Sequence, residues 1–444
     1  MPISPARVAA FDILLRVERD DSYASELLHS SGNAALSSAD HGLATELVMG
    51  VLRWRSLLDQ NIAGRSSQKL TRLDPEVLTA LRLAAYQLLF LDRVPQRAAV
   101  HESVELVKRA RKRSAVPFAN AVLRKFAGAA SGNAGVSAIG NTQTPAELAA
   151  SSAHPLWLVE RWIHEFGFEA AKGVCAYDQR IPQTAIRVTN ATSADELRKH
   201  KIQLSPGQLL TSAYRMVSGD LTATRPFREG QVMIQDEASQ LVSLLVGHGT
   251  NILDCCAAPG GKTRTLAERN PNASIIAMEL HPHRARILRK LVLETNVKLI
   301  VADARNLPLT ALFDRVLADV PCSGTGTLAR NPEIKWRLKP EDLIDLQGRQ
   351  RSILRSAMER VSPGGRIVYS TCSLEKEENS EVVEAMYEDH SFRVLDCRIE
   401  LERLHSQGEL RWGDIESLTS GPYLRTIPGV HPCDGFFAAI LEKI

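Results

Sequence analysis

Two cysteine motifs in the C-terminal half of the chain contain residue types suited to covalent catalysis. Asp319-Val-Pro-Cys322 and Ser370-Thr-Cys372-Ser373 each follow a short apolar segment that predicts a strand. A thiolate is an effective nucleophile when positive charge or a helix dipole lowers its pKa from about 8.5. The alternative is a pair of structural thiols, but Pro-Cys and Thr-Cys at strand ends place both outside the sheet core. The pattern favours two thiols that face one crevice.

A glycine-rich loop precedes both cysteine motifs. The stretch CAAPGGKT, residues 256–263, ends like a nucleoside triphosphate loop, but Cys256 occupies the position where that motif requires glycine. Pro259 also removes one backbone donor from any phosphate cradle. The fingerprint Gly-x-Gly-x-x-Gly of dinucleotide-binding loops is absent from the sequence. A short glycine turn favours a nucleoside ligand without phosphates, such as S-adenosylmethionine. Lys262, in the same loop, is a candidate source of positive charge for the thiols.

Carboxylates stand at the ends of the other predicted strands. Glu279 ends the second strand, Asp303 the third and Asp319 the fourth. An acid at the second strand end can hold a ribose diol, and Asp303 could accept from an adenine amino group. Any one of these acids alone is explained as a helix N-cap. Five consecutive strand ends with an acid, a thiol or a glycine loop predict a single site.

One reaction uses a methyl donor, a nucleophilic thiol, an acid and a second thiol together. Carbon 5 of cytosine becomes nucleophilic only after a thiolate adds to carbon 6 and breaks the aromaticity of the ring. An acid that hydrogen-bonds to N3 eases this addition, and carbon 5 then attacks the sulfonium methyl. Departure of the carbon 5 proton and of the thiol completes the cycle. The base must be unstacked and presented singly. The residues alone do not say which cysteine attacks.

The elements that would position these groups form an α/β fold. From about residue 250, short apolar segments predict strands: NILDCCA, SIIAMEL, KLIVADA, FDRVLADVP, GRIVYST and GFFAAILEK. Helical segments such as HRARILRKLVLET lie between most of them. This alternation is typical of a doubly wound, mostly parallel sheet, which binds ligands at the carboxyl ends of its strands. We therefore expect a Rossmann-like catalytic domain over residues 236–444.

The N-terminal part predicts a helical bundle. Apolar residues recur at i, i+3, i+4 and i+7 through residues 4–127. Asp40 and Asp74 stand where N-caps are expected, and Pro75 suits a first helical position. Residues 128–147 are small and mostly uncharged, and they predict a flexible linker. Residues 148–235 predict a small mixed α/β subdomain that connects the linker to the catalytic domain.

Composition excludes several classes of protein. No apolar run approaches the roughly 20 residues of a membrane helix. The N-terminal stretch lacks the pattern of a signal peptide, so we expect a cytoplasmic protein. The seven cysteines form no CxxC pair and no Cys/His cluster with zinc spacing. We therefore expect free thiols and no bound metal.

The quoted motifs resemble those of a known family. DCCAAPGGKT, DVPCSGTG, YSTCSLEKEEN and DGFFAAILEK resemble, in this order, the RNA cytosine-5 methyltransferases of the NOL1/NOP2/Sun class over about residues 150–444. The helical region with its linker resembles the NusB-type RNA-binding domain. The combination resembles the bacterial 16S rRNA cytosine-5 methyltransferases of the RsmB type. It implies methylation of cytosine 967 of 16S rRNA, presented as a flipped-out single-stranded or loop base, by a monomeric enzyme.

The resemblance also implies a role for each site residue. It makes Cys372 the nucleophile, gives Cys322 a part in product release, and places Asp319 on cytosine N3 and N4 with Lys262 near the base. One departure is Glu279, where the family more often has Asp, although Glu can still bridge a ribose diol. Cys255 is expected to pack within the first strand. The positions implied for donor binding are Cys256, Ala257, Ala258, Pro259, Gly260, Gly261, Lys262, Glu279, Asp303 and Asp319.

Basic charge is concentrated near the end of the helical region. Residues 1–150 carry 18 Lys and Arg against 14 Asp and Glu, in a chain with a net charge of +3. Such a cluster is usually a solvated helix face. With RNA as the implied substrate, we expect contacts to phosphates. The cluster comprises Lys108, Arg109, Arg111, Lys112 and Arg113.

Two other functions remain open at this point. A tRNA cytosine-5 methyltransferase would use the same catalytic motifs, and only the NusB-like region disfavours it. A non-catalytic RNA-binding or assembly factor could keep the fold. The presence of both cysteines, Asp319 and Lys262 argues against that second alternative.

Overall fold

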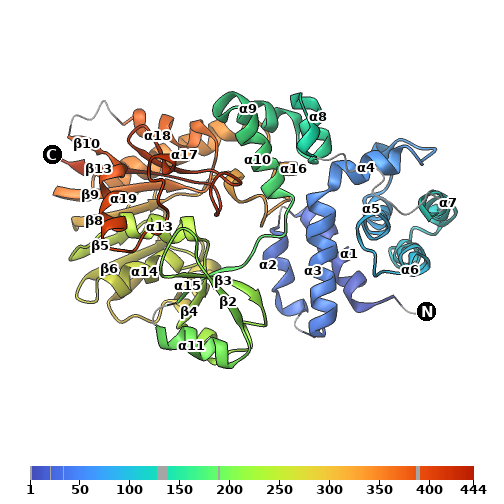
Figure 1. Ribbon diagram of the computed structural model, residues 1–444, viewed down its shortest axis with the longest axis horizontal. Coiled ribbons are helices and arrows are strands. Elements are labelled where there is room, and N and C mark those ends of the chain that lie inside the picture. Colours follow the sequence, from blue (N-terminus) through green and yellow to red (C-terminus); the bar gives the residue numbers. More distant parts are fainter. Residues whose placement is uncertain (1–2, 21, 34, 128–138, 189–190, 387–390) are drawn as a thin grey trace. The chain divides into compact units, whose positions relative to one another are not determined.

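The computed structural model describes residues 3–20, 22–33, 35–127, 139–188, 191–386 and 391–444 (Figure 1). The chain forms two compact units. The helical unit consists of Met1–Ile181 together with Leu328–Arg337, and the α/β unit consists of Pro182–Thr327 together with Leu338–Ile444. The predicted linker of residues 128–147 falls partly outside the described residues, which resume at residue 139.

The helices predicted for the N-terminal region are confirmed. Their periodic apolar residues meet in one core that includes Phe11, Leu47, Leu81, Leu106 and Leu123, each at most 1% exposed. The predicted helix over residues 40–62 is interrupted at Trp54, so it forms two helices. The helices are α1 (Pro5–Arg19), α2 (Ala24–Leu28), α3 (Ser38–Arg53), α4 (Arg55–Ala63), α5 (Pro75–Phe90), α6 (Gln96–Arg109) and α7 (Val116–Ala127).

One of the two predicted N-caps is wrong. Helix α3 is capped by Ser37, whose hydroxyl accepts from the backbone N–H of Asp40, and Asp40 lies within the first turn. Ser37 precedes the acid by three residues, so the helix begins earlier than predicted and the backbone N–H of Asp40 is itself the donor that the cap satisfies. Asp74 does stand at the N-cap of α5, with Pro75 as the first helical residue.

The helical unit continues beyond residue 147. A capping box of Thr144 and Glu147 starts α8 (Pro145–Ser151), which is followed by α9 (Leu156–Phe166) and α10 (Phe168–Asp178). The subdomain predicted over residues 148–235 is therefore divided between the two units.

A short segment from the C-terminal half of the sequence also packs in the helical unit. It contains α16 (Ile334–Arg337). The ammonium of Lys335 donates to the backbone carbonyl of Arg53 at 3.0 Å, and Trp336 donates to that of Leu52 at 2.6 Å. Burial lowers the pKa of Lys335 to about 7. Saturated backbone and side-chain bonds, rather than apolar contact alone, hold this segment in place.

The α/β unit begins with a small antiparallel sheet in the order β2-β3-β1-β4. Its strands are β1 (Ala185–Val188), β2 (Gln203–Pro206), β3 (Ala213–Ser218) and β4 (Val232–Ile234). Two helices accompany it, α11 (Ala191–Lys199) and α12 (Arg225–Arg228).

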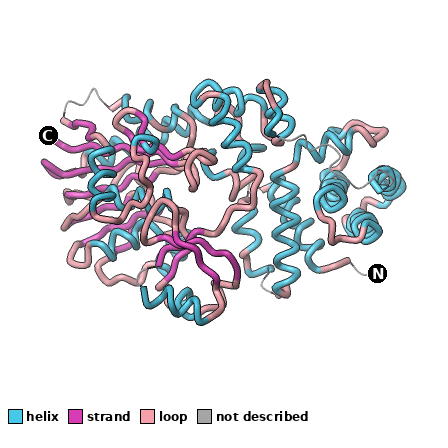
Figure 2. The backbone as a smooth tube through the Cα atoms, viewed as in Figure 1, coloured by secondary structure: helices cyan, strands magenta, loops and turns pink. Residues whose placement is uncertain are grey.

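The large sheet has the order β11-β12-β13-β9-β8-β5-β6-β7, with β10 paired to β13 (Figure 2). The five strands β9, β8, β5, β6 and β7 are parallel, and the pairs formed by β10 to β13 are antiparallel. The six predicted strands are confirmed as β5 (Asn251–Asp254), β6 (Ser274–Glu279), β7 (Val297–Val301), β8 (Phe313–Asp319), β9 (Val361–Thr371) and β13 (Phe436–Lys443). The remaining strands are β10 (Phe392–Leu395), β11 (Thr419–Ser420) and β12 (Tyr423–Thr426).

Helices cover both faces of this sheet. Ile252 and Leu317 point into the core under α13, α14 and α19, whereas Leu253 and Val316 point into the core under α17 and α18. Neighbouring residues in a strand face opposite sides, so buried strands need apolar residues at successive positions. The helices are α13 (Glu237–Leu245), α14 (Gly261–Arg269), α15 (Pro282–Leu291), α17 (Asp342–Met358), α18 (Ser380–Glu384) and α19 (Cys397–Ser406).

The strand order positions the site. From β5 the chain proceeds outward to β6 and β7, then returns to the other side of β5 to form β8 and β9. The order reverses between β5 and β8, and ligands of such sheets bind outside the carboxyl ends of the strands at this point. The glycine loop after β5 and the Pro-Cys motif after β8 are therefore brought to one crevice.

Close packing in the helical unit gives a test of the core. A methyl group at Gly50 would overlap the ring of Tyr86, whose hydroxyl donates to Glu46 at 2.5 Å. We expect Gly50→Ala to lower the free energy of unfolding by about 1–2 kcal/mol, because overpacking outweighs the gain in helix propensity. Urea unfolding followed by tryptophan fluorescence measures this change, since Trp54, Trp157, Trp162 and Trp336 all belong to this unit.

Gly42 is the matched control on the same helix. It is exposed and has open space where a methyl group would stand. Gly42→Ala should raise the free energy of unfolding by roughly 0.5–1 kcal/mol. Equal effects of the two substitutions would show that the Tyr86 contact does not limit packing in α3.

Candidate active site

The two predicted thiols lie side by side. The Sγ atoms of Cys322 and Cys372 are 3.3 Å apart. The backbone N–H of Gly326 donates to the carbonyl of Cys372 at 2.9 Å, and that of Gly435 donates to Gly326 at 2.8 Å. A side chain at Gly326 would overlap the backbone of Gly435, so glycine is required for this approach. The loop after β8, the loop after β9 and the turn before β13 are thus joined behind the thiols.

The environment keeps Cys322 protonated. Its hydrogen bond with Cys372 is the largest cause that raises the pKa of Cys322 well above its ordinary value, followed by burial. At neutral pH this residue is a thiol, whose S–H can be shared with its neighbour.

An ion pair adjoins the thiols. The ammonium of Lys262 lies 2.7 Å from the carboxylate of Asp319, which also accepts from the hydroxyl of Ser370 at 2.8 Å. Burial alone would lower the pKa of Lys262, but attraction to Asp319, with a smaller contribution from Cys372, raises it above its ordinary value. Lys262 therefore carries a positive charge that favours negative charge on both neighbours. Its ammonium also lies 5.2 Å from the ring centroid of Phe436.

A buried acid at the end of β5 supports the glycine loop. Asp254, at the end of β5, accepts from the hydroxyl of Thr263 at 2.7 Å. Burial raises the pKa of Asp254 to about 7. Gly260 has φ +121°, and a side chain there would press on Leu288 and Val292 of the neighbouring helix. The loop can follow this tight path only with glycine at that position.

The loop cysteines differ from the thiol pair. Cys255 is 2% exposed and packs beneath the loop, as expected. Burial raises the pKa of both Cys255 and Cys256. Ala257 bonds through its backbone N–H to the carbonyl of Met278 at 2.8 Å, which ties the loop to β6. Cys255 is buried, whereas Cys256 is partly exposed, as Cys322 and Cys372 are. The charged neighbours that act on Cys256 are acids such as Asp254 and Glu279, which disfavour a thiolate there.

The acids after β6 and β7 fit a nucleoside. One oxygen of Glu279 accepts from the backbone N–H of His281 at 2.8 Å. Its other oxygen lies 3.9 Å from Arg284, beyond hydrogen-bond distance, and so can accept from a ribose hydroxyl. Asp303 is ionised, because hydrogen bonds from Arg305 hold its pKa below the ordinary value, and it is partly exposed. Both residues lie at the edge of the sheet that also carries the glycine loop.

The structure adds residues to which the sequence assigned no role. Glu378 is fully buried beneath the thiols and accepts hydrogen bonds from both cysteine loops. The next residue, Asn379, bonds to Thr371 and to the backbone of Ser373. Both lie inside the stretch SLEKEEN, which follows the second cysteine. This proximity was the only feature of the sequence that pointed to a role for them.

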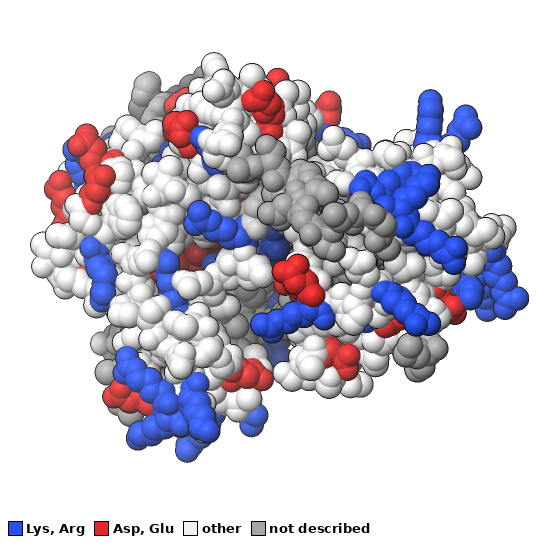
Figure 3. Space-filling view, turned by 45° about the vertical axis from the view of Figure 1, so that its right-hand side comes forward, with Lys and Arg blue, Asp and Glu red and all other residues white. Residues whose placement is uncertain are grey.

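The basic cluster of the helical unit is largely paired with acids. Three of its five members bond to carboxylates: Lys108 to Glu105 at 2.6 Å, Arg109 to Asp12 at 2.7 Å and Lys112 to Asp74 at 3.2 Å. Arg111 and Arg113 are exposed, and neither forms an ion pair with a described residue. On the face shown in Figure 3, basic side chains lie in several separate groups.

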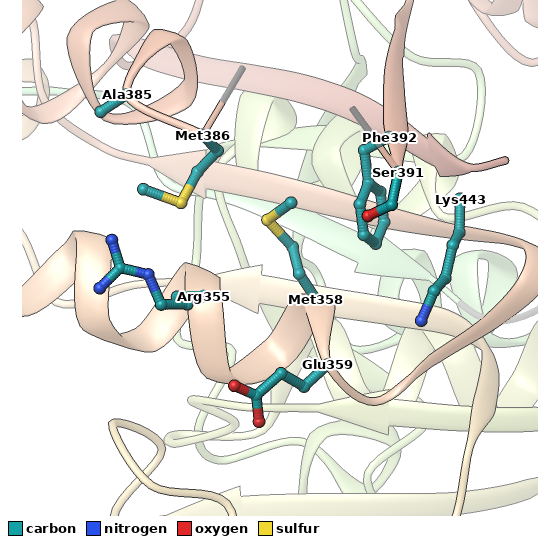
Figure 4. A pocket seen from close by; sticks show the side chains of 8 residues that line it. All are labelled: Arg355, Met358, Glu359, Ala385, Met386, Ser391, Phe392 and Lys443. Carbon is teal, nitrogen blue, oxygen red and sulfur yellow. The ribbon is translucent and has the colours of Figure 1, made fainter. Parts of the chain in front are cut away.

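A cavity of about 620 Å³ lies at the opposite edge of the large sheet (Figure 4). Met358, Met386 and Phe392 surround it together with charged side chains. Lys443 of β13 also lines it. The residue before it, Glu442, pairs with Arg366 of β9, whereas Cys372 follows the last residue of β9. The cavity is therefore separate from the site. Among the described residues, no cluster of three or more His, Cys, Asp or Glu could hold a metal ion, and no described helix is long and apolar enough to cross a membrane.

Fold and site together define a class of protein. A parallel sheet with a glycine loop after its first strand and a free carboxylate oxygen after the next is the arrangement of S-adenosylmethionine-dependent methyltransferases. The crystal structure of PH0851 aligns over 100% of both chains with a TM-score of 0.80 and 24% identity. A methyltransferase homolog protein from Pyrococcus horikoshii aligns over 68% of this chain and 100% of its own, with a TM-score of 0.55 and 27% identity.

Sequence comparison identifies the family. Residues 242–442 match the family model described as 16S rRNA methyltransferase RsmB/F, and residues 4–128 match the NusB family. The probable ribosomal RNA small subunit methyltransferase B of Bacillus subtilis is 33% identical over 100% of both chains. The ribosomal RNA small subunit methyltransferase B of Vibrio cholerae is 30% identical over 94% of both. The chain belongs to the RsmB/F family of rRNA methyltransferases and uses S-adenosylmethionine.

The buried carboxyl group of Asp254 should make stability depend on pH. Its folded pKa of about 7 exceeds the value of about 3.9 in an unfolded chain. Between these values the folded state binds more protons, so the contribution of Asp254 is lost as the pH rises through 7. Relative to wild type, Asp254→Asn should therefore gain stability as the pH rises from about 4 to about 7, and the difference should stay level above about pH 7. Hydrogen exchange of β5 and β8 amides at each pH measures the difference.

The matched control is Asp345→Asn, which removes the same charge from the exposed side of α17. If the difference between Asp254→Asn and wild type does not vary with pH, Asp254 is not the buried acid that titrates in this range.

Proposed function

We propose that this enzyme methylates carbon 5 of cytosine 967 in 16S rRNA, through a covalent bond between Cys372 and carbon 6. The observation that carries the proposal is the 3.3 Å approach of two thiols beside the Lys262–Asp319 ion pair. The names of the relatives and of the family model support the small-subunit rRNA as the substrate.

The first step is assigned to Cys372. Its sulfur attacks carbon 6, and the electron pair of the carbon 5–carbon 6 bond moves into the ring. The attacking species is a thiolate, and Lys262 supplies a positive charge near this sulfur. Asp319, paired with Lys262, accepts from the N4 amino group of the base, and it relays the proton that Cys372 loses to N3, where negative charge develops.

Methyl transfer and release follow at the same edge of the sheet. S-adenosylmethionine supplies the methyl group, and residues 256–261 with Glu279 and Asp303 would hold it. Cys322, which stays protonated in the resting enzyme, first gives its proton to solvent water and then, as a thiolate, accepts the proton of carbon 5. Once carbon 5 is deprotonated, the double bond re-forms and the bond from carbon 6 to Cys372 breaks.

Further features of the proposal concern the setting of the reaction. The cytosine must leave its stack to reach the thiols, so a single-stranded or loop base is expected. We propose a monomer, as the family resemblance implies. An rRNA substrate and seven free cysteines favour the cytoplasm. As functional regions we propose residues 1–127, the linker 128–147, the connecting subdomain 148–235 and the catalytic domain 236–444, although the third of these is divided between the two compact units after Ile181.

The two cysteine variants should fail in different ways. Cys372→Ala should abolish methyl transfer while it leaves S-adenosylmethionine binding unchanged, because the carbon 6 adduct cannot form. Cys322→Ala should form the adduct but release it slowly, so that a protein–RNA species of low mobility accumulates on a denaturing gel. Methyl transfer to rRNA fragments and the gel band measure both effects.

The matched control is Cys397→Ala, which removes a buried thiol at the start of α19. Normal turnover of Cys372→Ala would show that this residue is not the nucleophile. Continued turnover without an adduct in Cys322→Ala would remove its role in release.

We also propose that Arg111 and Arg113 contact rRNA phosphates, because the other members of the basic cluster are held by acids. Replacing both with Gln should weaken RNA binding and reduce the slope of log affinity against log salt by roughly 0.7 per residue. The same exchange at Lys108 and Arg109 should change the slope less. An unchanged slope in the Arg111 and Arg113 variant would show that these residues form an ordinary solvated surface.

A further inference from the structure

A single buried carboxylate connects the two cysteine loops. Glu378 is 0% exposed, and its Oε1 atom accepts from the backbone N–H of Ser323 and from the side chain of Gln350, both at 2.8 Å. Its Oε2 atom accepts from the hydroxyls of Ser323 and Ser373, the latter at 2.5 Å. Four donors thus converge on one side chain, which compensates for the cost of burying its charge.

The donors come from positions next to the thiols. Ser323 directly follows Cys322 in the loop after β8, and Ser373 directly follows Cys372 in the loop after β9. Gln350 of α17 also donates to the carbonyl of Pro321 at 3.0 Å. The carboxylate of Glu378 is therefore bonded to Ser323 and Ser373, each of which directly follows a cysteine. Through Gln350 it is also linked to Pro321, which precedes Cys322.

Other bonds fix Glu378 itself. Its backbone carbonyl accepts from the hydroxyl of Tyr369 at 2.5 Å, within β9. The neighbouring Asn379 accepts from the hydroxyl of Thr371 at 2.5 Å and donates to the carbonyl of Ser373 at 2.9 Å. The carboxylate is consequently rigid relative to β9, and it transmits that rigidity to the loop after β8.

We propose that Glu378 is a positioning residue for the two thiols, which sets the separation of Cys322 and Cys372 by holding the serine that follows each of them. This inference rests on the proposed use of both cysteines. Glu378 touches neither thiol and takes no part in bond making. A carboxylate suits the task because it only accepts, and one of its oxygens can receive both hydroxyls.

The amide of glutamine has the same shape but cannot perform this function. Its NH₂ group would face the two serine hydroxyls, which must then rotate to accept, or its carbonyl must turn away from Ser323 N–H and Gln350. In either case one loop loses a bond that the other keeps. A small relative shift of reacting groups costs about 100-fold in rate.

The test compares Glu378→Gln with Glu384→Gln, which removes the same charge from the exposed end of α18. Two quantities are measured in the full-length enzyme. The first is kcat and KM for methyl transfer. The second is the rate at which diamide converts Cys322 and Cys372 to a disulfide, followed by mass spectrometry of the linked peptides. Disulfide formation reports the approach of the thiols and requires neither RNA nor a methyl donor.

Glu378→Gln should reduce kcat by about 100-fold, leave KM for S-adenosylmethionine within about twofold, and slow disulfide formation at least about tenfold. Glu384→Gln should match wild type in both measurements. A fall in kcat with an unchanged rate of disulfide formation would overturn the proposal, because the thiols would then be placed correctly without the carboxylate.

A second variant keeps the test decisive if Glu378→Gln no longer binds S-adenosylmethionine. Ser323→Ala combined with Ser373→Ala removes both hydroxyl bonds to Oε2 of Glu378, and it leaves the carboxylate and the bond from the backbone N–H of Ser323 to Oε1 in place. It should slow disulfide formation in the same direction, and wild-type rates of both reactions in this variant would overturn the proposal. Activity of Cys372→Ala would refute the proposed reaction, but the disulfide measurement would still decide the role of Glu378.

Discussion

The parallel pairing of β8 with β9 is the constraint on which the site depends. This pairing aligns Asp319 with Ser370, so the residues that follow each strand leave the sheet at the same level. Cys322 and Cys372 each follow that pair within a few residues, and their sulfur atoms lie 3.3 Å apart. A shift by one residue would exchange the sheet faces of every β8 side chain and separate the thiols. The cores on both faces of the sheet exclude this shift, because they would then contain charged residues.

The charges near the thiols are each compensated by a specific partner. Lys262 has Asp319, and Glu378 has four donors. Unpaired charges of this kind would be too costly to bury. The pairing also keeps the groups in fixed positions, which lets the protein hold a cation, an acid and two thiols beside one another. Asp254, beneath the glycine loop, is the exception, and its raised pKa records the cost of burying it.

Much of this architecture could be predicted, for reasons that particular residues make clear. The central strands are short apolar runs such as SIIAMEL, and a strand buried on both faces has little alternative to such a composition. The N-cap of α3 was misplaced because Ser37 and Asp40 are both good caps, and local sequence does not decide between them. The basic cluster was correctly located as a concentration of charge, but its pairing with Asp12, Asp74 and Glu105 arises from residues distant in sequence or on the next turn.

The sequence by itself determined the chemistry of the site: the glycine loop, the strand-end acids and two cysteines, each tied to a local pattern of a strand followed by a turn. Such patterns can be recognised in the sequence because strand ends and glycine turns depend on only a few consecutive residues. Only the tertiary structure decided which groups touch. Glu378 lies 55 residues from Ser323 and five from Ser373, and a bond between loops that far apart exists only when the strands that carry them are paired. The segment Leu328–Arg337 gave no sign in the sequence that it would pack in the helical unit, because its burial depends on carbonyl groups at Leu52 and Arg53 that no local pattern announces.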